Sequence, residues 1–104
     1  MDETFRALAD ATRRALLDRL HQKSGATLGE LCEGLDMTRQ AVSKHLAILQ
    51  EANLVVALKE GRERRHYLNP VPIHEIADRW IGKFERNRLD ALSDLKKNLE
   101  GENQ

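Results

Sequence analysis

The clearest pattern of apolar and polar positions in the chain lies between residues 39 and 52. At about 100° per residue, Val42, Leu46 and Leu49 share one side of a helical wheel. The opposite side offers hydrogen-bond donors and no acid in its first two turns: Arg39, Gln40, Ser43 and Lys44. A solvated helix normally interleaves acidic and basic residues on its outer face, so this face is predicted to contact a partner.

A second short helix is predicted immediately before this one. Thr27-Leu28-Gly29-Glu30 has the form of a capping box, and Gly34 is well placed to end the helix that the box opens. Only three residues separate Gly34 from Thr38, which is a good N-cap for the helix at 39–52. Two helices joined by so tight a turn predict a helix-turn-helix over residues 27–53.

The segments on either side complete a small domain. Upstream, helices are predicted over residues 2–9 and about 13–22, the second capped by Asp10 or Thr12. Downstream, residues 54–68 read as a strand, a turn and a returning strand, with the ring of Tyr67 predicted on the inner face of the hairpin. A hairpin directly after a helix-turn-helix predicts a winged helix, which is mainly α with a small β-hairpin.

The segment 72–99 is predicted to be a long C-terminal helix, because little in it opposes helix formation. Residues 85–88 are polar all round, so the helix is expected to bend or divide there. Its apolar stripes, with those of the first helix, exceed what one small domain can cover. We therefore predict a single domain over residues 1–104 that forms a homodimer, with these residues at the interface: Phe5, Leu8, Ile76, Trp80, Phe84, Leu92 and Leu95.

Composition restricts the class of protein but does not indicate its function. The chain has 104 residues, 40% of them hydrophobic and 33% charged, which is typical of a small soluble domain. No apolar run approaches the length of a membrane span, and the N-terminus lacks a signal pattern, so a cytoplasmic location is expected. The net charge is zero, but residues 37–68 carry six basic and three acidic side chains.

The donors on helix 39–52 are the side-chain types that bind base edges and phosphates in DNA. Ala47 lies near the centre of the same face, where a small residue lets the helix approach a groove. As a wing, the hairpin would place Arg62 and one of Arg64 or Arg65 near phosphates or in a minor groove, although charge also protects an exposed strand edge from aggregation. We therefore predict double-stranded DNA as the partner.

Other chemistries have little support in the sequence. Ser43 and His45 lie on different sides of their helix and cannot act as nucleophile and base, so no enzyme is predicted. His45 falls within the apolar arc and is predicted to be buried or half-buried and bonded to backbone. The four histidines are scattered and Cys32 is the single cysteine, so neither a metal site nor a cofactor is predicted.

Three motifs carry a resemblance to a known family. Phe-x-Ala-Leu-Ala-Asp-x-Thr-Arg-Arg, Val-Ser-x-His-Leu-x-x-Leu and Glu-Gly-Arg-x-x-x-Tyr occur in that order, and over about residues 3–70 the chain resembles the ArsR (ArsR/SmtB) family of winged-helix regulators. The resemblance implies a homodimeric repressor of an imperfectly palindromic operator, regulating its own or a neighbouring operon. It also implies DNA contacts from the helix and the wing: Thr38, Arg39, Gln40, Ser43, Lys44, Arg62, Arg64 and Arg65.

The family's metal-binding patterns are incomplete here. The Cys-x-Cys of the family's arsenic and cadmium sensors aligns with Cys32-Glu33-Gly34, which keeps one of the two thiols. Other members place metal ligands on the last helix, where this sequence has a single histidine, His74. The chain is therefore expected to be a member that does not sense metals. Two alternatives remain. One is a sensor that responds to a ligand at the dimer interface near Trp80 and Phe84 or to a thiol switch at Cys32, and the other is a protein-interaction module.

Overall fold

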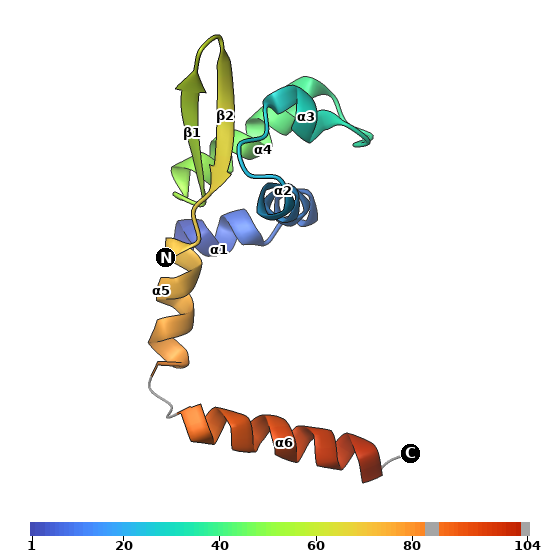
Figure 1. Cartoon of the computed structure of the whole chain (residues 1–104), viewed down its shortest axis with the longest axis vertical. Helices are drawn as coiled ribbons and strands as arrows, with labels where there is room; N and C mark the ends of the chain where they lie inside the picture. Colours follow the sequence, from blue (N-terminus) through green and yellow to red (C-terminus); the bar gives the residue numbers. More distant parts are fainter. Residues whose placement is uncertain (83–85, 103–104) are drawn as a thin grey trace. The chain divides into compact units, whose positions relative to one another are not determined.

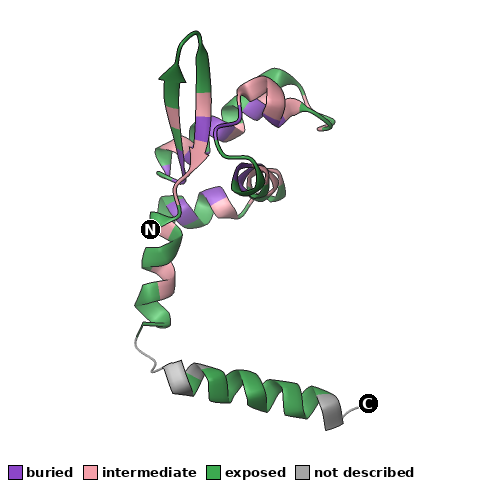
Figure 2. Ribbon diagram, in the orientation of Figure 1, coloured by how far each residue is buried: buried purple, intermediate pink, exposed green. Residues whose placement is uncertain are grey.

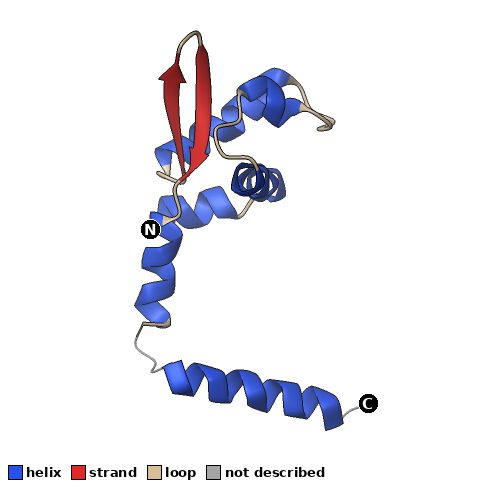
Figure 3. Cartoon of the chain, viewed as in Figure 1, coloured by secondary structure: helices blue, strands red, loops and turns tan. Residues whose placement is uncertain are grey.

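The computed structural model describes residues 1–82 and 86–102, and within them the chain is mainly helical with one two-stranded antiparallel sheet (Figures 1 and 3). This confirms the predicted winged helix. The elements, in chain order, are α1 (Asp2–Leu8), α2 (Ala11–Gln22), α3 (Leu28–Cys32), α4 (Arg39–Glu51), β1 (Val55–Glu60), β2 (Glu63–Leu68), α5 (Val71–Trp80) and α6 (Arg86–Glu102).

Side-chain caps start the helices where the sequence predicted them. Asp10 accepts a hydrogen bond from the backbone N–H of Arg13 at 3.1 Å, so Asp10 and not Thr12 is the N-cap of α2. Thr27 and Glu30 form the complete capping box of α3, with bonds of 3.2 and 3.1 Å. Thr38 caps α4 by accepting from the N–H of Ala41 at 3.1 Å. Each cap satisfies a donor at a helix start that would otherwise have no partner.

The capping box makes stability depend on pH through Glu30. A hydrogen bond from the Lys23 ammonium, supported by the Thr27 backbone N–H, lowers the pKa of the Glu30 carboxyl from 4.5 to about 2. A carboxyl whose pKa is lower in the folded state contributes stability above its unfolded pKa and loses it as pH falls through the folded pKa.

We therefore expect the free energy of unfolding of the Glu30→Gln variant to fall less than that of the wild type between pH 4.5 and about pH 2. Urea unfolding at a series of pH values measures this difference. Glu33→Gln, at the exposed C-cap of α3, is the control and should follow the wild type. Parallel pH profiles for wild type and Glu30→Gln would contradict the assignment.

The hydrophobic core lies among α2, α3, α4 and the base of the hairpin. Its largest fully buried side chains are Leu16, Leu20, Leu31, Val42, Leu49 and Leu54. Figure 2 shows the buried segments of α1, α2, α4 and β2 gathered in this part of the chain. Because Val42 and Leu49 point into this core, the opposite side of α4 is turned outward.

Turn residues connect α4 to the hairpin and close the hairpin itself. Asn53 takes the left-handed conformation at φ 60°, which asparagine tolerates better than most residues, and so ends α4 as predicted. β1 and β2 pair in register from Val55 opposite Leu68 to Glu60 opposite Glu63. An interaction that the sequence did not reveal joins Ala26 to His66, so the segment before α3 pairs with the other edge of β2.

The helix predicted over residues 72–99 is two helices in the structure. α5 ends at Trp80 and α6 begins at Arg86, beside the polar segment where a bend or division was expected, and residues 83–85 lie outside the described part of the chain. Contacts divide the chain into two compact units, Met1–His74 and Glu75–Gln104. Gly82 follows α5 in a turn where any larger residue would clash, because an added Cβ would lie 2.6 Å from the backbone carbonyl oxygen of Asp78.

No helix in residues 1–82 or 86–102 combines the length and apolar character that crossing a membrane requires.

Candidate nucleic-acid interface

The outer face of α4 presents the donors that the sequence singled out. Arg39, Gln40, Ser43 and Lys44 are all exposed, while Val42 and Leu46 on the other side are buried. The arrangement follows from the 3.6-residue period of the helix, since the core holds α4 by its apolar stripe. The core thus presents these polar side chains to solvent on a rigid element.

An open groove of about 470 Å³ runs beside this face, between α4, the start of α3 and the hairpin. Its lining residues from α4 and the hairpin are Arg39, Ser43, Leu46, Gln50, Arg62, Glu63, Arg64 and His66. The structure therefore brings together two predicted residues of the helix, Arg39 and Ser43, with two of the wing, Arg62 and Arg64. Gln40 and Lys44 are exposed on α4 and do not line the groove.

The pairing register assigns the wing arginines to different faces. Arg64 lies opposite Lys59 and shares a face of the hairpin with His66, the face that borders the groove. Arg62 lies in the turn between the strands. Both side chains are exposed, and within the described residues neither forms an ion pair with an acidic side chain. They are therefore available to a polyanion.

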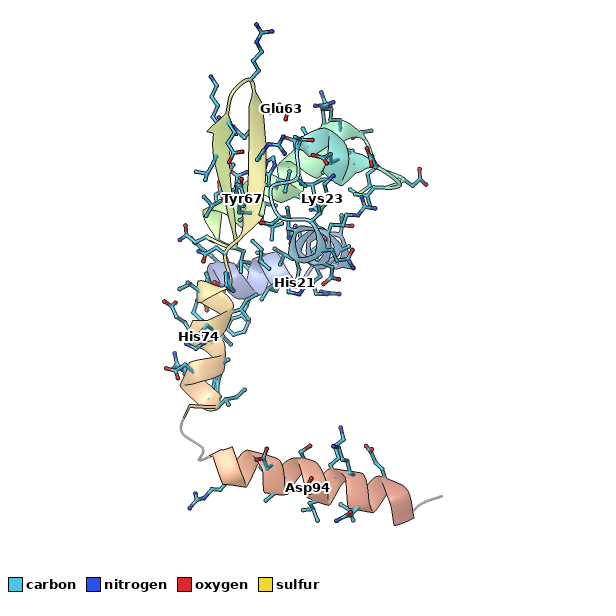
Figure 4. The ribbon with its side chains drawn as sticks, in the orientation of Figure 1. His21, Lys23, Glu63, Tyr67, His74 and Asp94 are labelled. Carbon is cyan, nitrogen blue, oxygen red and sulfur yellow. The ribbon has the colours of Figure 1, made fainter. Side chains whose placement is uncertain are left out.

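Arg65 faces the other way and contacts the protein itself. Its guanidinium donates to the carbonyl oxygen of Gly25 at 3.0 Å and to Glu63 at 2.9 Å, and its Nε lies 3.4 Å from Glu60. Glu63 lies near the tip of the hairpin in Figure 4. The structure therefore assigns Arg65 a role in holding the hairpin, and its predicted DNA contact has less support than those of Arg62 and Arg64.

Three arginines of α2 also donate hydrogen bonds to backbone carbonyl oxygens. Arg13 and Arg14 donate to carbonyl oxygens at the end of α1, with Arg14 bound to that of Leu8 at 2.7 Å. Arg19 donates to the carbonyl oxygen of Leu31 at 3.0 Å, at the end of α3. Carbonyls at a helix C-terminus lack partners within the helix, and cations there also complement the helix dipole. These arginines therefore hold the helices together.

The two histidines near the site have different surroundings from those predicted. His45 is half-buried as expected, but its described partners are side chains and not backbone: Arg13 at 3.3 Å and Asp10 at 4.0 Å. His66 was not identified from the sequence. It is 4% exposed, its Nδ1 bonds the carbonyl oxygen of Ala26 at 2.9 Å, and it lines the groove. The alternation of side chains along β2 was the sequence feature that could have identified His66 as an inward-facing residue.

The prediction for Tyr67 is wrong about the face. Tyr67 lies opposite Val56, which is 42% exposed, so the two share the outer face of the hairpin and not the face of His66. Its hydroxyl donates to Glu60 at 2.6 Å, which raises the pKa of Tyr67 because ionisation would place two negative charges together. Figure 4 shows Tyr67 on β2 below the tip.

The residues predicted to form a dimer interface are partly exposed. Trp80 is 51% exposed with the Arg79 guanidinium 5.5 Å from its ring centroid, and Leu92 and Leu95 of α6 are 55% and 54% exposed. Phe5 is exposed as well, whereas Leu8 and Ile76 are half-buried. Phe84 lies outside the described residues. Figure 2 colours the ribbon of α6 as exposed wherever its residues are described.

Comparison with known proteins decides the family. The family profile described as a helix-turn-helix domain matches residues 8–56. The chain is 38% identical over 86 residues to the HTH-type transcriptional regulator YuzN of Bacillus subtilis, covering 77% of this chain and 94% of that one. A solved ArsR-like transcriptional regulator from Rhodococcus sp. RHA1 is 31% identical with a TM-score of 0.72, covering 93% and 90% of the two chains. This chain belongs to the ArsR family of transcriptional regulators.

A further relative is the transcriptional repressor SdpR of Bacillus subtilis, 32% identical over 85 residues, covering 81% of this chain and 91% of that one. The helix-turn-helix match runs from the end of α1 to the start of β1 and so includes the whole of α4. This ArsR-family chain is thus a DNA-binding regulator of transcription and not an enzyme. Its α4 is the second helix of the helix-turn-helix, and the hairpin that follows is the wing of the winged-helix fold.

Proposed function

We propose that the chain is a homodimeric repressor that binds an imperfectly palindromic operator and acts on its own or a neighbouring operon. The observation that carries this proposal is the exposed, donor-rich face of α4 beside a groove bordered by Arg62 and Arg64. The direction of regulation follows from the relatives that are named as repressors. A regulator works where its DNA lies, so a cytoplasmic location is part of the proposal.

In this proposal α4 enters the major groove. Arg39, Gln40, Ser43 and Lys44 then reach base edges and phosphates, and Thr38 adds a hydroxyl at the helix start in addition to its capping bond. Arg62 and Arg64 contact phosphates on the flank, while Arg65 acts mainly within the hairpin. Because the net charge of the chain is zero, a large part of the affinity comes from this one cationic face and weakens steeply with salt.

The exposed apolar side chains support the homodimer. Leu92, Leu95 and Leu99 recur at helical spacing on α6, and each is more than half exposed. A contiguous apolar stripe of this kind is uncommon on a monomer and typical of an interface. Two recognition helices related by a two-fold axis read half-sites about one turn of DNA apart, which is why an imperfect palindrome is proposed. That the chain senses no metal stays a prediction.

The double substitution Arg39→Ala and Lys44→Ala tests the proposed DNA contact. We expect it to weaken binding at least ~30-fold, because each side chain contributes a base or phosphate contact. The probe is a duplex that the wild-type protein selects from random-sequence DNA, and fluorescence anisotropy measures the affinity. Sedimentation equilibrium of the same samples measures the oligomeric state.

Lys96→Ala with Lys97→Ala in α6 is the matched control, since it also removes two positive charges from exposed positions. It should change affinity less than about threefold, as expected for nonspecific electrostatics alone. If both double variants lost affinity equally, or the α4 variant bound normally, the assignment of the α4 face would be wrong. A monomer at every concentration would contradict the homodimer.

A further inference from the structure

Arg13 links three parts of the helix-turn-helix unit through one guanidinium. Its Nε donates to the carbonyl oxygen of Ala7 at 2.8 Å and its Nη2 to that of Arg6 at 3.0 Å, both near the end of α1. Its Nη1 lies 3.3 Å from Nδ1 of His45, which is 32 residues away in the chain, on α4. One side chain of α2 thus connects α1 to the recognition helix.

The chemistry of this contact decides which atom must accept the hydrogen bond. A guanidinium carries five N–H donors and no acceptor, so a hydrogen bond to Nδ1 requires that Nδ1 accept. A hydrogen bond between the two side chains therefore needs the tautomer of His45 that carries its proton on Nε2. Asp10, whose Oδ1 lies 4.0 Å from the same Nδ1, is occupied in capping α2 through the backbone N–H of Arg13.

His45 also lies on the side of α4 away from the DNA-reading side chains. It is half-buried, next to the buried Leu49 on the wheel and apart from the exposed Arg39 and Ser43. It therefore contacts no base in the proposed complex. A substitution at His45 reaches DNA only through the position of the helix.

We propose that Arg13 and neutral His45 position the recognition helix, coupling the C-terminal end of α1 to α4. The inference rests on the proposed DNA-binding role of α4 and concerns how that helix is held. A proton on Nδ1 removes the acceptor and places an imidazolium against the guanidinium, with Asp10 as the competing partner. Arg13 and Asp10 are the described charged groups that interact with His45. Operator affinity therefore depends on the protonation of His45.

His45→Asn and His45→Leu separate positioning from simple packing. Asparagine keeps an oxygen acceptor close to the place of Nδ1 and does not titrate, whereas leucine keeps bulk and removes the acceptor. We expect His45→Leu to bind the selected duplex about tenfold more weakly at pH 7.5, the effect of losing a hydrogen bond to a charged group. His45→Asn should stay within about twofold of the wild type, because it keeps the acceptor.

The pH profile adds a measurement that a merely structural role would not change. Because a proton on Nδ1 would remove the acceptor, we expect the affinity of the wild type to fall relative to that of His45→Asn as the pH is lowered from 7.5 to 5.5. Dividing one profile by the other cancels the titration of groups that both proteins share. His21→Asn, at an exposed histidine of α2, is the control and should keep the wild-type ratio.

The outcomes distinguish this inference from the proposed function. If the wild type binds DNA and Arg39→Ala with Lys44→Ala abolishes binding, the function of α4 stands. The positioning role is then overturned if His45→Leu, shown to be folded by circular dichroism, binds as the wild type does. It is also overturned if His45→Asn and the wild type have the same pH profile, a comparison that remains available should His45→Leu fail to fold.

Discussion

Replacing Ala47 with glutamate is expected to reduce operator affinity at least ~100-fold while leaving the fold intact. The added carboxylate would repel the phosphates, and the larger side chain would keep α4 away from the base edges in the major groove. Ala47 is exposed on α4, near the centre of the face that carries Gln40, Ser43 and Lys44. Its methyl group lets the helix axis approach the bases. Because the residue is exposed and glutamate favours helix, the free energy of unfolding should change by less than about 0.5 kcal/mol.

Anisotropy with the selected duplex measures the affinity, and urea unfolding checks the fold. Ser93→Glu introduces the same side chain at an exposed position of α6 and should leave affinity within about threefold of the wild type. If Ala47→Glu bound the selected duplex with an affinity close to that of the control, the centre of this face of α4 would not lie in the major groove.

Leu49→Ala should lower the free energy of unfolding by about 3 kcal/mol, since it leaves a cavity in a closely packed core. Leu49 is 0% exposed and belongs to the cluster that joins α4 to α2 and the base of the hairpin. A loss of this size is a large share of the stability of a small domain. DNA binding should decline with the folded fraction.

Leu58→Ala supplies the matched comparison, because Leu58 on β1 is 51% exposed and loses little contact on truncation. Its effect should stay below about 1 kcal/mol. Urea unfolding at one fixed protein concentration gives both values, which avoids confusing folding with subunit association. Equal losses for the two variants would mean that α4 is not held by the core described here.

The helix-turn-helix could be predicted from sequence because its determinants are local. The bond between Thr27 and Glu30 and the bond from Thr38 to Ala41 each span three residues. Helical periodicity then assigns faces on α4, so the exposure of Arg39 and Lys44 follows directly. The break in the helix predicted over residues 72–99 was placed only approximately, at the polar segment 85–88, because helix propensity alone does not locate a break.

In the hairpin the strands were predicted correctly, but the side chain of Tyr67 was assigned to the wrong face. Alternation separates His66 from Tyr67, but the sequence does not tell which of the two faces is covered. That choice depends on Ala26, which pairs with His66 across 40 residues of chain. Tyr67 was therefore assigned to the wrong face, and His66 was missed.

By itself the sequence determined the elements, their caps and the donor-rich face of α4, because each depends on residues within about one helical turn. Only the tertiary structure decided which basic side chains face outward and which hold the fold. Arg13 and Arg65 bind partners on other segments, up to 40 residues away, whereas Arg62 and Arg64 remain exposed at the wing. The physical reason is that an arginine's role depends on the acceptors that folding brings within its reach.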